Sequence, residues 1–70
     1  MAVHFQVETE REDDGRWIAE IPALPGVMAY GRSRQEAVWN AQALALRVMA
    51  DRLENGEPVA ETSQLFSVVP

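Results

Sequence analysis

Apolar and polar side chains alternate over two stretches of the chain, and a period of two residues predicts β-strands. Residues 3–8 carry apolar side chains at each odd position, and so do residues 16–21. Between the two stretches, Asp13-Asp14-Gly15 is a turn signal. The pattern therefore predicts a β-hairpin with one buried face and one solvent-exposed face.

Burial of both apolar rows fixes the loop length of this hairpin. A two-residue loop would turn the rows toward opposite faces of the sheet. A three-residue loop at residues 13–15 pairs Thr9 with Ala19, so that both rows lie on one face. The same register pairs Val7 with Ile21. The last loop position is a glycine, which suits the left-handed conformation that such a loop needs.

Prolines and glycines divide the next part of the chain into a short strand and one long helix. Residues 27–30 form a third strand between a Pro-Gly turn and Gly31. A capping box at residues 33–36 begins a helix that runs for about 21 residues, or roughly 31 Å, to the stop signal Asn55-Gly56.

The C-terminal residues predict one more strand. Residues 65–69 are rich in β-branched and aromatic side chains. The element order is then β-β-β-α-β in a single domain over residues 1–70. We expect an α+β fold of two layers, in which one long helix packs on one face of a mainly antiparallel four-stranded sheet.

The predicted helix carries more apolar surface than a small sheet can cover. At about 100° per residue, one stripe of five residues faces the sheet: Ala37, Ala41, Leu44, Ala45 and Val48. Four further apolar residues fall outside this stripe: Trp39, Leu46, Met49 and Leu53. Either the C-terminal segment folds back over them, or they contact another subunit or a partner protein. We favour an interface, with Trp39 as its anchor, because tryptophan is enriched at interface hot spots.

The charge balance disfavours nucleic acid as a direct partner. The chain has 11 acidic and 6 basic side chains and a net charge of −5. Without a basic patch, counterion release cannot drive binding to a phosphate backbone. The negative charge either keeps the protein soluble or attracts a basic partner. Because the chain has no cysteine, no signal peptide and no membrane-spanning stretch, we expect a soluble cytoplasmic protein.

Few residues offer catalytic or metal-binding chemistry. His4 is the single histidine, and it lies on the polar face of a predicted strand. Glu8 and Glu10 belong to an acidic edge that continues into the hairpin loop. Clustered carboxylates serve two-metal nucleases, but on a solvated strand face they also suit a basic protein partner. We expect no catalytic residue, no metal and no cofactor, and we name Glu8 and Glu10 as candidate partner contacts.

An ordered set of motifs resembles the HicB-like antitoxin domain. The motifs are DGRWIAEIP at residues 14–22, LPGV at 24–27, GRS at 31–33, and Glu36, Ala37 and Asn40. The resemblance spans roughly residues 3 to 69. It implies a partial ribonuclease H fold with strand order 3-2-1-4, in which the last strand lies parallel to the first. It also implies a homo-oligomer, either a dimer or a tetramer.

The resemblance also implies a function. HicB-like antitoxins bind and mask HicA, a small basic toxin that cleaves mRNA, and many carry a C-terminal module that binds operator DNA. This chain ends at Pro70 without such a module, so we expect no direct binding of DNA. An active nuclease of this fold needs a carboxylate on the last strand, and residues 65–69 have none. We therefore expect an antitoxin-like protein-binding module. The alternatives are a homo-oligomeric domain without a toxin partner and a metal-dependent nuclease.

Overall fold

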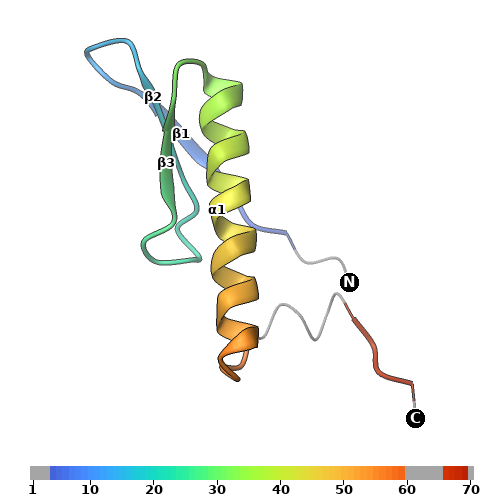
Figure 1. The fold of residues 1–70 in the computed structure, drawn as a ribbon. Coiled ribbons are helices and arrows are strands. Elements are labelled where there is room, and N and C mark those ends of the chain that lie inside the picture. The colour runs from blue at the N-terminus through green and yellow to red at the C-terminus, as the bar shows by residue number, and fades with distance from the viewer. Residues whose placement is uncertain (1–3, 60–65, 70) are drawn as a thin grey trace.

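Three antiparallel strands and one helix form two layers (Figure 1). The computed structural model describes residues 4–59 and 66–69. The elements are β1 (Glu8–Arg11), β2 (Trp17–Glu20), β3 (Met28–Gly31) and α1 (Arg34–Glu54). The strands lie in the order β1-β2-β3, and α1 packs along one face of the sheet. The α+β class and the two-layer arrangement are confirmed, with three strands in place of four in the described part of the chain.

The first hairpin has the loop that burial requires. Thr9 pairs with Ala19. The Glu12 N–H donates to the Arg16 carbonyl oxygen at 2.7 Å, and the Gly15 N–H donates to the Glu12 carbonyl oxygen at 3.0 Å. Gly15 has a φ of +92°, in the left-handed region that glycine enters without steric cost. The predicted three-residue loop and its register are confirmed.

The first strand begins later than the alternating pattern predicts. β1 starts at Glu8, and residues 4–7 form no strand. Hydrogen-bonded and non-hydrogen-bonded pairs alternate along this antiparallel ladder. After the hydrogen-bonded pair of Glu8 and Glu20, the next such pair would join residue 6 to Pro22. Proline has no N–H to donate, so the ladder ends there. The two apolar side chains of residues 4–7 still pack half-buried against the core, on the predicted face. Residue 3 lies outside the described residues.

The link between β2 and β3 consists of two consecutive turns. The Leu24 N–H donates to the Ile21 carbonyl oxygen at 2.9 Å, and the Val27 N–H donates to the Leu24 carbonyl oxygen at 3.0 Å. Pro25 and Gly26 occupy the centre of the second turn, where Gly26 has a φ of +85°. Leu24 is buried, so this link adds a core residue that the sequence analysis did not include. The third strand begins one residue later than predicted.

The start of α1 carries the capping box that the sequence predicts. The Ser33 hydroxyl oxygen accepts a hydrogen bond from the Glu36 N–H at 3.1 Å. The Glu36 carboxylate in turn accepts a hydrogen bond from the Arg32 N–H at 3.1 Å. The serine thereby satisfies a backbone donor of the first turn, and the glutamate satisfies the N–H of the residue before the cap.

The end of α1 closes in a Schellman motif. The Gly56 N–H donates to the Leu53 carbonyl oxygen at 3.0 Å, and the Glu57 N–H donates to the Arg52 carbonyl oxygen at 2.8 Å. Gly56 has a φ of +75°, which this motif requires at the position after the cap. The predicted stop signal is confirmed, and the helix has the predicted length of 21 residues.

Small side chains form most of the contact between the sheet and α1. Seven buried residues make up the core cluster: Ala19, Ile21, Leu24, Val27, Ala37, Ala41 and Ala45. Four of these are alanines, so the helix lies close to the strands. The approach is especially tight at Gly31, where an added Cβ would lie 2.8 Å from the Glu36 carbonyl carbon and 2.9 Å from Ala37 Cα. No side chain fits between β3 and α1 at this point.

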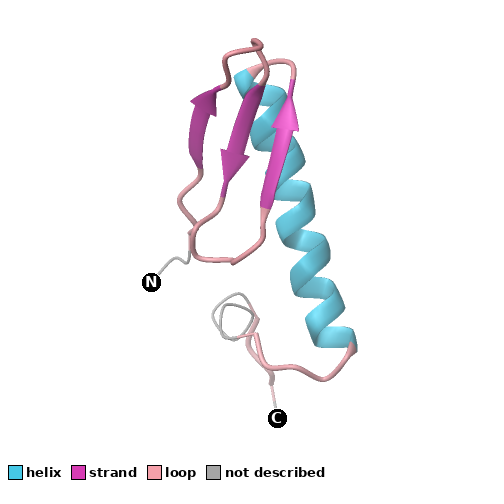
Figure 2. Ribbon diagram, turned by 90° about the vertical axis from the view of Figure 1, so that its left-hand side faces the viewer, coloured by secondary structure: helices cyan, strands magenta, loops and turns pink. Residues whose placement is uncertain are grey.

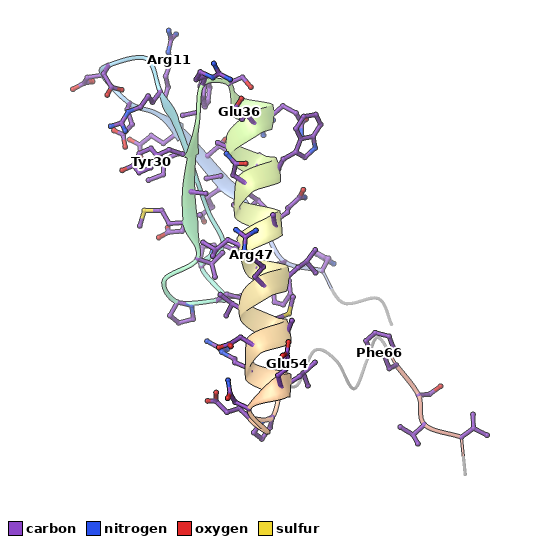
Figure 3. The ribbon with its side chains drawn as sticks, in the orientation of Figure 1. Arg11, Tyr30, Glu36, Arg47, Glu54 and Phe66 are labelled. Carbon is purple, nitrogen blue, oxygen red and sulfur yellow. The ribbon has the colours of Figure 1, made fainter. Side chains whose placement is uncertain are left out.

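The predicted fourth strand is not formed by residues 66–69. These residues adopt no regular structure, and Phe66 is 70% exposed and lies apart from the sheet (Figure 3). Leu65, the first residue of the predicted strand, lies outside the described residues. A β-prone composition makes a strand only where the segment gains burial and a pairing partner. In the residues that the structure describes, the order is therefore β1-β2-β3, and β1 is paired on one edge only.

Gly31→Ala is expected to destabilise the fold by about 3 kcal/mol, because the added methyl group would overlap backbone atoms of α1 that cannot move aside. Urea-induced unfolding followed by circular dichroism measures this change. Ala23→Gly changes an exposed position in the link between β2 and β3 by the same methyl group and is expected to cost at most about 1 kcal/mol. Equal stability of Gly31→Ala and the parent protein would contradict the close approach.

Candidate protein-binding surfaces

The sheet face opposite α1, which we call the open face, is not covered by any described element. Side chains alternate between the two faces along each strand, and the buried Ala19 marks the face that packs on α1. The register places six side chains on the open face: Glu8, Glu10, Ile18, Glu20, Met28 and Tyr30. Figure 2 views the molecule from this side, with α1 behind the strands. Figure 3 shows Tyr30 pointing away from the helix.

Three carboxylates surround one apolar side chain on the open face. Glu8 lies directly opposite Glu20 in the register. Glu10 lies opposite Ile18, and these four residues line a shallow depression. Within the described ranges, none of the three carboxylates forms an ion pair. Like charges that face each other across two strands are destabilising, so this arrangement does not strengthen the hairpin.

A cation and an aromatic ring border this acidic part of the open face. The Arg16 guanidinium lies 4.6 Å from the centre of the Tyr30 ring. Arg16 Nε donates to Asp14 Oδ2 at 2.8 Å, and the Arg16 N–H donates to Asp14 Oδ1 at 3.1 Å. The backbone hydrogen bond from Arg16 lowers the pKa of Asp14, and the neighbouring guanidinium acts in the same direction. The hairpin thus holds one cation in place beside the three exposed carboxylates.

The pKa of Asp14 tests this hairpin geometry. We expect an NMR titration to give a pKa below the usual value of 3.8 in the folded protein. Because the folded pKa is the lower one, the charged carboxylate stabilises the fold above pH 3.8, and this contribution is lost as the pH falls through the folded pKa. Arg16→Ala keeps the backbone N–H, so this variant is expected to recover only part of the shift. A full return to the usual pKa in Arg16→Ala would contradict the leading role of the backbone hydrogen bond.

The outer face of α1 exposes three large apolar side chains. Trp39 is 63% exposed, Leu46 is 65% exposed and Leu53 is 48% exposed. Each follows the previous one by seven residues, so the three lie in one row along the helix. Their predicted position away from the sheet is confirmed, and their role in an interface stays a prediction.

Met49 does not share this exposed face, contrary to the prediction from the helical pattern. It is 8% exposed, and it continues the buried row that starts at Ala37 and repeats every four residues. Leu44 and Val48, which the prediction placed in the buried stripe, are only half-buried. The alanines of this row pack against the sheet, so the buried stripe of α1 is rotated toward Met49 relative to the predicted stripe.

A groove between the segment before β1 and α1 was not predicted. Its lining includes Phe5 from that segment and Ala45, Leu46 and Met49 from the helix. The groove is open because the first strand stops short and leaves this side of α1 partly uncovered. The signal in the sequence is Pro22, which cannot extend the β1–β2 ladder.

The six predicted interface residues thus fall in different places. Glu8 and Glu10 lie together on the open face, while Trp39, Leu46 and Leu53 lie on the other side of the molecule. The partner of Glu8 in the acidic cluster, Glu20, was not predicted as a contact, although the predicted register placed the two strands correctly.

Within the described ranges, no three His, Cys, Asp or Glu side chains are placed together so that they could hold a metal ion. Among residues 4–59 and 66–69, no helix combines the length and the apolar character needed to cross a membrane.

No protein-family model, curated protein or solved structure matches this chain. The functional assignment therefore depends on the sequence motifs and on the chemistry of the two exposed surfaces.

Proposed function

We propose that this chain is an antitoxin-like protein-binding module, which masks a small basic toxin of the HicA type that cleaves mRNA. The HicB-like motifs suggest this role, and one structural observation carries it. Glu8 and Glu20 lie directly opposite each other on the open face, with no cation between them in the described part of the chain. A partner that brings a lysine or an arginine to this pair would replace repulsion by attraction.

The remaining side chains of the open face suit a protein partner. Met28 is 44% exposed and Tyr30 is 45% exposed; Tyr30 lies opposite Ile18 in the register, and Met28 lies opposite Glu20. Protein interfaces combine an apolar centre, often with tyrosine or methionine, with a polar rim. The net charge of −5 would also accelerate the encounter with a basic protein.

The antitoxin proposal gives the C-terminal segment a position as well. Residues 65–69 would add a fourth strand along the free edge of β1 and complete the order 3-2-1-4. This strand is part of the proposal and not of the observed sheet.

Co-expression tests the proposed role in cells. The proposal requires a small basic protein encoded next to this chain. That protein is expected to stop growth when produced alone, and growth is expected to return when both proteins are produced. The two proteins should also purify as one complex. A neighbour that is harmless alone, or RNA cleavage by this chain itself, would contradict the antitoxin role.

Neutralising the open face is expected to weaken the complex with the basic neighbour by about tenfold or more. The variant E8Q/E20Q removes two carboxylates from the open face, and the control D51N/E57Q removes the same charge from the C-terminal end of α1 and the residues after it. Calorimetric titration compares the two variants at low and high salt concentrations.

The stability of E8Q/E20Q separates a lost contact from a lost fold. This variant is expected to gain about 0.5 kcal/mol in the free energy of unfolding, because the repulsion between the facing carboxylates is removed. A variant that is more stable and yet binds less tightly would identify the carboxylates as contacts. Equal weakening by E8Q/E20Q and D51N/E57Q would show that only net charge matters and would contradict a site on the open face.

A further inference from the structure

The outer side of α1 carries a continuous apolar row, which we call the seam. Its members are spaced four, three, four and three residues apart and are all exposed: Trp39, Ala43, Leu46, Ala50 and Leu53. This is the repeat of a helix that packs lengthwise against another helix. It runs along most of α1, whose 21 residues are about 31 Å long.

The seam takes no part in the contact between α1 and the sheet. That contact uses the buried row from Ala37 to Met49, which is centred roughly 140° away from the seam around the helix. The two rows approach each other where Leu46 and Met49 line the same groove. The seam and the buried row each follow a helical repeat, so α1 has two packing faces and the described part of the chain covers one of them.

Large and small side chains alternate along the seam. Trp39 is followed by Ala43, Leu46 by Ala50, and the row ends at Leu53. When two such rows run antiparallel, Trp39 of one helix faces Ala50 of the other, and Leu46 faces Ala43. Trp39 and Leu46 then each meet an alanine, while Leu53 lies beyond these layers at the end of the row. The alanines allow the helices to approach to about 8 Å.

We propose that the seam pairs with the seam of a second copy of this chain, in an antiparallel arrangement with a two-fold axis near residues 44 and 45. A two-fold axis requires a self-complementary surface. When the seam is reversed about residues 44 and 45, its large side chains fall opposite its alanines. In a parallel pair, Trp39 would face Trp39 and alanine would face alanine, which overfills some layers and leaves others empty.

The charge beside the middle of the seam disfavours a basic partner. Arg47 borders the middle of the seam, whereas Glu36 and Glu54 border its two ends. In the antiparallel register, neither Arg47 nor Glu54 faces a like charge of the second copy. A basic protein would meet Arg47 here, whereas it meets three carboxylates on the open face. The pairing of the seam does not depend on the proposed toxin, and it leaves the open face of each copy on the outside of the dimer.

Leu46→Asp tests the pairing. Analytical ultracentrifugation over a dilution series is expected to show a monomer–dimer equilibrium for the parent protein and a monomer for the variant, because two central layers would each receive a buried charge. Circular dichroism should stay unchanged, since Leu46 lies outside the core cluster. Asp51→Ala, on the polar side of α1, serves as the control and should dimerise like the parent protein. A parent protein that is monomeric at every concentration overturns the proposal.

Ala43→Leu separates interlocking packing from general stickiness. The change adds apolar surface, but it fills the space that Leu46 of the second copy would occupy. We expect the dimer to weaken by about tenfold. A simple hydrophobic patch would associate more strongly after this change, and that result would overturn the proposed packing.

The direction of pairing is measured with spin labels. The chain has no cysteine, so Glu54→Cys gives a single labelling site at the end of α1. In the antiparallel dimer the two labelled positions lie about 28 Å apart along the helix axis. In a parallel dimer they would lie about 10 Å apart across the interface. Pulsed electron paramagnetic resonance distinguishes the two distances, and the shorter one overturns the antiparallel arrangement.

Discussion

The close contact between β3 and α1 at Gly31 is the constraint on which the rest of the structure depends. An added Cβ at this position would meet backbone atoms of Glu36 and Ala37, so helix and strand touch without any side chain between them. Alanines continue the contact along the helix at positions 41 and 45. Where backbone lies against backbone, a rotation or a shift of the helix opens a gap or creates a clash. The contact therefore decides which helix residues face the sheet and which face outward.

This fixed orientation gives the molecule two exposed surfaces with different chemistry. The open face of the sheet carries three carboxylates around Ile18 that form no ion pair with a described residue, whereas the outer side of α1 carries an apolar seam beside Arg47. A core made largely of alanine buries little area, and small domains commonly gain stability by association. In the proposed arrangement, the seam supplies that association, and the open faces stay available to a basic partner on both sides of the dimer.

The sequence predicts most of the local structure because short-range chemistry determines it. Burial of both apolar rows selects the three-residue loop, and Ser33, Glu36 and Gly56 define the ends of the helix. The predicted start of β1 is too early because the alternating pattern of residues 3–8 extends beyond the position opposite Pro22, where a missing N–H ends the ladder. Alternation reports which side is buried and does not report which backbone groups are free to pair.

The candidate sites could be predicted only in part, because they depend on how elements pack. Met49 was assigned to the outer face from the helical pattern alone, but the alanine row brings the helix in along another line and buries it. The facing pair of Glu8 and Glu20 follows from the predicted register, yet its value as a binding site depends on the open face, which no described element covers. The last strand required a pairing partner that composition does not specify, and residues 66–69 form no strand.

Amide-resolved NMR of the parent protein during dilution tests the central claim most directly, namely that packing at Gly31 leaves α1 with an outward seam for a second copy and a separate open face. We expect the dilution-dependent shifts to follow the seam, at Trp39, Leu46 and their neighbours, and the signals of Glu8 and Glu20 to stay unchanged. Shifts centred on the strands of the open face, or a spectrum that does not change with concentration, would contradict this account.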